Sequence, residues 1–215
     1  MFRRHTRRSA RRHAIATLLS LTAAASLSAA GCSEDEKATP QAIFDGTLQR
    51  VGSGLDPEIT DCPDTGPLFL LGAFGTPGLA EDDPNRASRP VKDGEADRQG
   101  TAQVICSVTP AGPDQFNVSA SVTLSGALGG VFTLRQATVS TVGDQTGINA
   151  MFAKRTPPTN YSQADGGCTI RYTSAFQGVA PGRIWGEIEC PAAVNAGAQT
   201  ACKVVAQFRL ENCDQ

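Results

Sequence analysis

Apolar and polar residues alternate strictly along the stretch 115–125, where five apolar side chains are separated by polar ones. Because successive side chains of a β-strand point to opposite faces of a sheet, this alternation predicts a strand with one buried face. The stretch 104–108 alternates in the same way. The sequence at 110–114, Pro-Ala-Gly-Pro-Asp, is rich in turn-forming residues, so we expect the two strands to form a hairpin.

The apolar phase slips by one position within the next predicted strand. Phe132 and Leu134 lie in one phase, and Ala137 and Val139 lie in the other. One extra residue in a strand produces such a slip, which predicts a β-bulge near 135–136. Further strands are expected at 42–44, 68–71, 131–134, 148–153, 168–173, 183–190 and 202–210.

No window shows a long apolar stripe of helical period, and the best local candidate for a helix, 192–201, is interrupted by Gly197. The pattern predicts an all-β fold: a single antiparallel β-sandwich, or a partly open barrel, of about seven strands. Residues 101–215 are expected to form its core, and 41–100, rich in Gly and Pro, a loop-rich N-terminal part. Within that part, the polar stretch 81–100 is predicted to be a surface excursion.

Residues 1–31 have the order of a secretory signal peptide. Six arginines and no acid precede a weakly apolar stretch, 14–30, which is too short and too rich in Ser and Thr to span a bilayer. A transit peptide, which is also Arg-rich and free of acids, is the alternative interpretation. The pair Arg11-Arg12 adds a second alternative, twin-arginine export, beside an ordinary run of positive charge. The segment is therefore left out of the fold prediction.

The run Ala30-Gly31-Cys32 resembles the lipobox of bacterial lipoproteins. The resemblance implies that a peptidase cuts before Cys32 and that this cysteine carries a diacylglyceryl group and an N-acyl chain. The protein would then be anchored in the outer membrane or at the cell surface. Ala29 departs from the leucine that the family prefers there, and ordinary cleavage after Ala30 would instead leave Cys32 as a free thiol. Residues 32–40 are expected to form the lipidated N-terminus and a charged tether.

Removal of residues 1–31 changes the charge of the chain. Six of the 19 basic residues and none of the 21 acidic ones lie there, so the net charge falls from −2 to −8. An acidic chain without a basic patch repels phosphate backbones, so nucleic acid is not expected as a partner. Such a chain is not attracted to anionic lipid either, and membrane attachment would depend on the lipid anchor.

Six cysteines remain when Cys32 is assigned to lipid. They are Cys62, Cys106, Cys168, Cys190, Cys202 and Cys213. An even number in an exported chain predicts up to three disulfides, for which 15 pairings are possible. The loop-like segment 191–201 favours a bond between Cys190 and Cys202. A metal-thiolate site is the alternative, but the chain lacks both CxxC spacing and a histidine partner for it.

The strand ends Val104-Ile105-Cys106 and 187–191, Glu-Ile-Glu-Cys-Pro, resemble those of the actinobacterial lipoprotein-antigen family. In that family, cysteines on an early and a late strand are joined across a β-sandwich. The resemblance therefore implies a different pairing, between Cys106 and Cys190.

The mature chain contains no histidine, because His5 and His13 both lie in the signal segment. This excludes Ser-His-Asp and Cys-His catalysis and histidine-based zinc sites, so we expect no enzymatic activity, catalytic residue or cofactor. A hydrolase built on two carboxylates is the enzymatic alternative. Asp93, Glu95 and Asp97 are spaced as in a calcium loop without the rest of an EF-hand, and a solvated acidic loop is the other interpretation.

Trp185 is the only tryptophan, and the alternation of 183–190 places it on the outer face of its strand. An exposed aromatic residue would stack on a sugar or anchor a partner; alternatively, it packs under a loop. The sequence thus predicts a non-enzymatic envelope lipoprotein that acts as a structural or binding module. Its expected partners are the membrane, through the anchor, and an envelope protein or glycan. A small-ligand or carbohydrate site at Trp185 is the more specific alternative.

Overall fold

The computed structural model describes residues 37–98 and 100–215, which contain thirteen β-strands and no helix. The strands are β1 (Gln41–Gln49), β2 (Thr60–Asp61), β3 (Gly66–Leu71), β4 (Val91–Lys92), β5 (Ala96–Asp97), β6 (Gly100–Gly112), β7 (Gln115–Leu124), β8 (Gly130–Ser140), β9 (Gln145–Arg155), β10 (Pro158–Arg171), β11 (Gly178–Ala180), β12 (Arg183–Asn195) and β13 (Thr200–Glu211).

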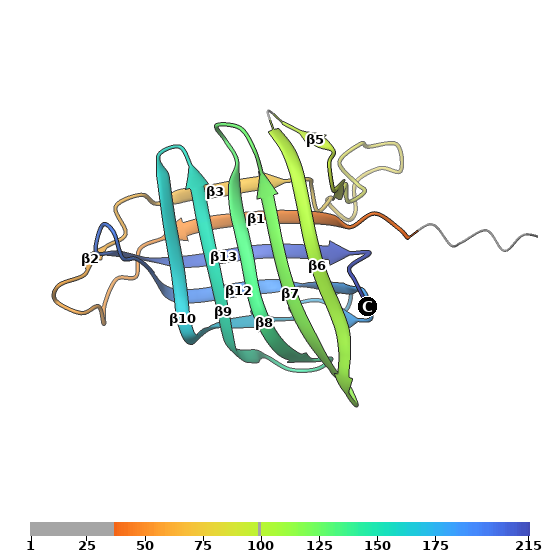
Figure 1. Cartoon of the computed structure of the whole chain (residues 1–215). Helices are drawn as coiled ribbons and strands as arrows, with labels where there is room; N and C mark the ends of the chain where they lie inside the picture. The colour runs from red at the N-terminus through yellow and green to blue at the C-terminus, as the bar shows by residue number, and fades with distance from the viewer. Residues whose placement is uncertain (1–36, 99) are drawn as a thin grey trace, which may run out of the picture. The chain divides into compact units, whose positions relative to one another are not determined.

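The strands join one sheet, whose main path runs β3-β1-β13-β12-β10-β9-β8-β7-β6-β5. This sheet folds over on itself: β6 to β10 form one layer, which crosses a second layer of β3, β1, β13 and β12 (Figure 1). All pairs in the path are antiparallel, and only the two-residue β2 pairs in parallel, with β13. The predicted all-β antiparallel fold is confirmed, although the strands number thirteen and not about seven.

The predicted hairpin forms between β6 and β7, and the predicted bulge forms in β8. Val118 pairs with Ala137 and Ala120 pairs with Leu134, so the two residues 135–136 oppose a single residue of β7. The slip in apolar phase therefore has the physical cause that the sequence indicates: an extra residue lets both halves of β8 face the core.

Strands extend beyond their predicted bounds in two places. The segment 192–201 contains no helix, as expected, but β12 continues to Asn195 and β13 begins at Thr200 after a tight turn. β10 begins at Pro158, ten residues before the predicted start. Its first half is polar and glycine-rich, so no alternation marks it, and pairing with β9 determines its conformation.

The C-terminal residues cover the edge of β6. Asp214 forms a parallel bridge with Ser107, in which the Val108 N–H donates to the Asp214 carbonyl at 2.8 Å. The Asp214 N–H donates to the Cys106 carbonyl at 2.9 Å, and the Gly182 N–H donates to the Val108 carbonyl at 3.1 Å. An uncovered edge would present unpaired backbone groups. These bonds partly close the sandwich into a barrel.

Phenylalanine rings fill the space between the two layers. The Phe132 ring centroid lies 5.0 Å from that of Phe44, 5.5 Å from that of Phe152 and 5.4 Å from that of Phe208. Phe69 stacks on Phe44 with 4.3 Å between centroids. Burial of each such ring contributes about 1.5–3 kcal/mol to the free energy of unfolding. The interior is thus a packed aromatic core.

The six cysteines form three disulfides, Cys62–Cys202, Cys106–Cys213 and Cys168–Cys190. The pairing predicted from the loop-like segment, Cys190 with Cys202, is wrong, and so is the pairing of Cys106 with Cys190 that the resemblance implies. The cause is the register: Cys190 lies opposite Val204 on β13, while Cys202 lies opposite Ala193.

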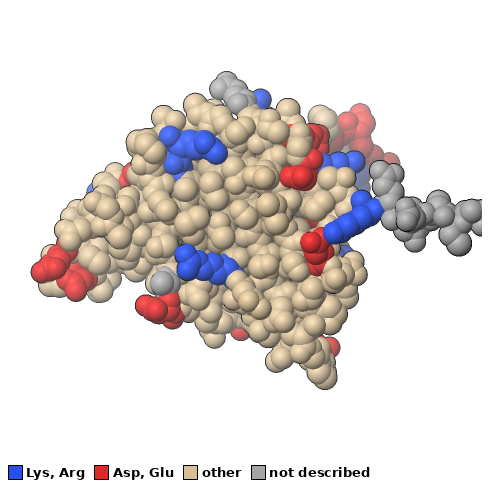
Figure 2. Space-filling view, in the orientation of Figure 1, with Lys and Arg blue, Asp and Glu red and all other residues tan. Residues whose placement is uncertain are grey.

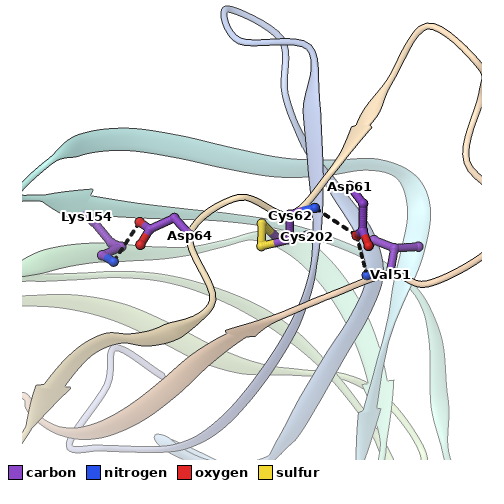
Figure 3. The surroundings of a disulfide bond; sticks show 6 residues. All are labelled: Val51, Asp61, Cys62, Asp64, Lys154 and Cys202. Atoms are coloured by element: carbon purple, nitrogen blue, oxygen red, sulfur yellow. Dashed lines mark hydrogen bonds and ion pairs between the residues drawn. A yellow bond between two sulfur atoms is a disulfide. The ribbon is translucent and has the colours of Figure 1, made fainter.

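The Cys62–Cys202 bond fastens the irregular segment 50–64 to β13 (Figure 3). The neighbouring Asp61 carboxylate accepts hydrogen bonds from the backbone N–H groups of Val51 and Cys62, each at 2.8 Å. The bond from Val51 is the main cause that holds the pKa of Asp61 below its usual value. A segment with almost no regular structure is therefore held by one covalent bond, by the Asp61 carboxylate and by an ion pair between Asp64 and Lys154 of β9 at 2.8 Å (Figure 3).

Candidate functional site

A hollow of about 360 Å³ lies on the outer face of the layer that contains β12 and β13. Trp185 of β12 and Arg209 of β13 line it side by side, because they are paired across the two strands. The loop that precedes β11 forms its rim with Phe176. Ile184 faces the core, so its neighbour Trp185 faces outward, as the alternation indicates.

Trp185 is half-buried, because a loop residue and a cation lie against its ring. Phe74 stacks on it with 6.2 Å between centroids and an interplanar angle of 19°. The Arg209 guanidinium carbon lies 5.2 Å from the ring centroid, within the range of a cation–π interaction. The indole N–H is buried and has no acceptor among the described residues. The ring therefore packs under a loop, as one interpretation expects, and it also lines a hollow; its use in binding stays a prediction.

Hydrogen bonds fix the side chain of Arg209 in the hollow. Its Nη1 donates to the Ser88 hydroxyl at 2.8 Å, and its Nη2 donates to the Glu211 carboxylate at 2.7 Å. Glu211 accepts a further bond from the Gln41 side chain at 2.8 Å. Arg209 therefore joins the loop that carries Ser88 to the sheet, and the Glu211 charge is already compensated.

Two side chains at the hollow remain available to a ligand. Arg183 is exposed and makes no side-chain hydrogen bond or ion pair with any residue that the structure describes. Phe176 is 81% exposed at the rim. Large apolar side chains with such exposure are typical of contact surfaces. An aromatic floor, an exposed aromatic rim and a free guanidinium are the features that bind a ring carrying polar substituents.

A second hollow, of about 450 Å³, adjoins the first along β13. Phe74, whose ring stacks on Trp185, lines this second hollow together with Gln207, the outward residue of β13 that precedes Arg209. The stacked pair of rings therefore separates two hollows on one sheet face. The segment 72–90, which contributes Phe74, lies across that face.

The proposed calcium residues do not converge on one point. Asp93 accepts a hydrogen bond from Val104 N–H at 2.8 Å, and Glu95 accepts one from Lys92 N–H at 3.0 Å. No group of three His, Cys, Asp or Glu side chains that would hold a metal occurs among the described residues. The calcium interpretation of Asp93, Glu95 and Asp97 therefore gains no support here, because each carboxylate bonds to different groups.

Asp97 also differs from a solvated surface acid. It is only 5% exposed, and it accepts bonds from the Gly72 N–H at 2.8 Å and from the Arg89 guanidinium at 2.9 Å. Burial raises the pKa of Asp97, but the bonds from Gly72 and Arg89 outweigh burial and hold it below its usual value. Asp97 thus ties together the two ends of the segment 72–90.

Acidic side chains are not paired in five surface hollows of the described chain, which include the two beside Trp185. Each of these hollows is lined by one acidic residue at most, which is Glu211 in the hollow at Trp185. A hydrolase of the retaining or inverting type needs two carboxyl groups across a cleft. The carboxylate alternative gains no support here and stays an untested prediction.

The aromatic partners of Trp185 could not be identified from the sequence. Tyr161 lies in the core. Tyr172 packs against the core and donates a hydrogen bond to the Ser140 carbonyl at 3.1 Å. Neither tyrosine lines the hollow. Phe74 and Phe176 occupy these roles instead. Both lie in loops, where no periodicity indicates the direction of a side chain.

Cys32 and the predicted signal lie outside the described residues. Within residues 37–98 and 100–215 there is no helix long and apolar enough to cross a membrane. A scan against protein-family models found no match, and searches of curated proteins and of solved structures also found none. The argument for function therefore depends on the chemistry of the hollow and on the predicted export.

Proposed function

We propose that the protein is an exported, lipid-anchored protein of the bacterial cell envelope that binds a carbohydrate at the Trp185 hollow, without catalysis. Three features support export and anchoring: the signal-like order of residues 1–31, the lipobox-like run that ends at Cys32, and three disulfides. Disulfides persist in oxidising compartments outside the cytosol. The acidic mature chain supports attachment through lipid and not through charge.

The observation that carries the ligand class is the combination of Trp185, Phe176 and Arg183 around one open hollow. The apolar faces of a sugar ring stack on an aromatic side chain, and its hydroxyls need hydrogen-bond partners. Arg183 offers donors that no described residue uses. The indole N–H of Trp185 is a further donor without a partner, should the Phe74 ring move aside.

Intrinsic fluorescence tests this site directly, because Trp185 is the only tryptophan in the chain. We expect one class of mono- or disaccharide from a neutral and acidic panel to change the emission in a saturable manner. Calorimetry on Trp185→Ala and Phe176→Ala should show binding at least about tenfold weaker, as for the loss of a stacked ring. Leu128→Ala, an exposed apolar residue that lines a different hollow, serves as the matched control. Undiminished binding by Trp185→Ala would contradict the proposal.

Intact mass of the protein from membranes tests the anchor. We expect acyl chains on Cys32 and a gain of six hydrogens on reduction, which corresponds to the three disulfides. A lipid-free mass that begins at Gly31 would contradict lipid anchoring. The carbohydrate proposal would then apply to a secreted protein.

A further inference from the structure

The regular pairing of strand β9 is interrupted on both sides beyond the same residue, although β10 pairs with β9 again at Ile148. Leu134 of β8 and Gln163 of β10 both pair with Ala150, on opposite sides of it. Beyond that point the residues 135–136 bulge out of β8, and three residues of β10, 164–166, oppose one residue of β9. Bulges redirect side chains and are frequent beside functional sites. Two bulges at one level leave an opening above β9.

This opening is a polar hollow of about 260 Å³. The Asn149 side chain of β9 lines it and accepts a hydrogen bond from the Gly166 N–H at 2.8 Å. The Gln163 side chain accepts one from the Ala192 N–H at 3.0 Å. The Gln163 NH₂ group lies against Gly167, so close that an added Cβ there would clash with it, and the NH₂ group of Asn149 is therefore the amide donor left to bind something else.

The backbone around the opening is fixed by close packing. Gly147 and Gly166 have φ of +78° and +70°, and a Cβ on Gly166 would lie 2.8 Å from the Gly147 Cα. The Cys168–Cys190 disulfide joins β10 to β12 just beyond. The opening is therefore formed before any ligand arrives, which lowers the entropic cost of binding.

Opposite charges stand on the two sides of the opening. Arg135 from β8 and Asp165 from β10 both line it, and both are exposed. Neither forms a side-chain hydrogen bond or an ion pair with any residue in the described ranges. The strands on either side of β9 are about 10 Å apart, so a gap separates the two charges. Most of the surface on this face of the molecule is uncharged (Figure 2).

We propose that this opening binds a small zwitterion, namely a free α-amino acid with a small side chain. The carboxylate would accept bonds from the Arg135 guanidinium and from the NH₂ group of Asn149. The ammonium would donate to the Asp165 carboxylate. Charge-assisted bonds of this kind are about twice as strong as neutral ones. The ligand would then lie across β9, with its carboxylate toward Arg135 on the β8 side and its ammonium toward Asp165 on the β10 side.

Calorimetric titration of the folded protein with L-alanine, acetate and ethylamine tests the proposal. We expect saturable binding of alanine. Acetate and ethylamine each carry only one of its two charged groups, so each should bind at least about tenfold more weakly. Arg135→Gln and Asp165→Asn should each weaken alanine binding about tenfold or more. Arg50→Gln and Asp82→Asn, which remove an exposed charge elsewhere, should leave it unchanged, and all four variants should melt like the parent chain.

Three outcomes would overturn the proposal. The first is that alanine does not bind saturably, and the second is that its binding survives both Arg135→Gln and Asp165→Asn. The third is that acetate binds as tightly as alanine, which would make the opening a simple anion site. Trp185 emission should not change with alanine, because the carbohydrate hollow is a separate site. The two proposals therefore succeed or fail independently.

Discussion

Replacement of both Cys106 and Cys213 by alanine would open the seam between β6 and the C-terminal residues. In the chain-entropy model, the stabilisation by a disulfide increases with the logarithm of the number of residues in the loop that it closes. This bond joins residues 107 positions apart. With Cys62–Cys202 intact, however, the shortest path that it closes is about 55 residues, which corresponds to about 4 kcal/mol.

The Cys168–Cys190 bond supplies a matched comparison. It joins residues only 22 positions apart, which corresponds to about 3.4 kcal/mol. The cysteines of both bonds are buried, with exposure of 4% or less, so alanine removes a similar sulfur environment in each variant. We therefore expect the Cys106→Ala/Cys213→Ala variant to be about 1 kcal/mol less stable than the Cys168→Ala/Cys190→Ala variant.

Urea unfolding at neutral pH measures the free energy of unfolding of both variants and of the parent chain. Hydrogen exchange of the Val108 and Asp214 amides adds a local measurement, because both amides donate across the seam. They should lose protection in the Cys106→Ala/Cys213→Ala variant alone. The reasoning is refuted if the short-loop variant is the less stable of the two, or if the seam amides stay protected when Cys106 and Cys213 are replaced.

Three further predictions follow from buried groups. Because the pKa of Asp97 is lowered by folding, its stabilisation is present above its unfolded pKa near 3.8 and is lost as the pH falls through the folded value; Asp97→Ala should cost about 2 kcal/mol at pH 7, and progressively less in urea unfolding as the pH is lowered below 3.8. Burial raises the pKa of Tyr172 to about 12 and also raises that of Tyr161, so absorbance at 295 nm should show no tyrosine ionisation near pH 10. The neutral form of buried Tyr172 stabilises the fold, and this contribution to the free energy of unfolding should be lost as the pH rises through about 12. Phe132→Ala should cost about 3–5 kcal/mol in urea unfolding, and a cost below 1 kcal/mol would contradict a packed core.

The sequence predicts a strand reliably where one face of the strand is buried and the other is exposed to solvent. β7 satisfies this condition along its whole length, and the phase slip in β8 even locates the bulge at 135–136. The first half of β10 does not satisfy it, because hydrogen bonds to β9 and not side-chain burial decide its conformation. The disulfides could not be predicted, because pairing depends on the register of β12 against β13.

The same distinction applies to the candidate sites. Alternation correctly places Trp185 on the outer face, since the register of its own strand is sufficient for that. Phe74 stacks on Trp185 from a loop more than one hundred residues earlier in the chain, and no local pattern encodes that contact. Arg135 and Asp165 likewise meet at one opening only because two bulges coincide at Ala150 of β9. Sequence periodicity describes faces of strands, whereas these sites arise between elements.

The packed interior determines where this protein can bind a ligand. A small barrel holds a ligand inside only if its inward side chains leave room. Here Phe132 and its neighbours occupy that space, and removal of one such ring would cost about 3–5 kcal/mol. Binding is therefore expected on the outer faces, where the regular pairing is interrupted by the segment 72–90 and by the two bulges beside β9. Irregular segments contribute few packed contacts of their own, so the Asp97 carboxylate, which holds the ends of the segment 72–90, and the Cys168–Cys190 disulfide beside the bulge of β10 support these outer sites.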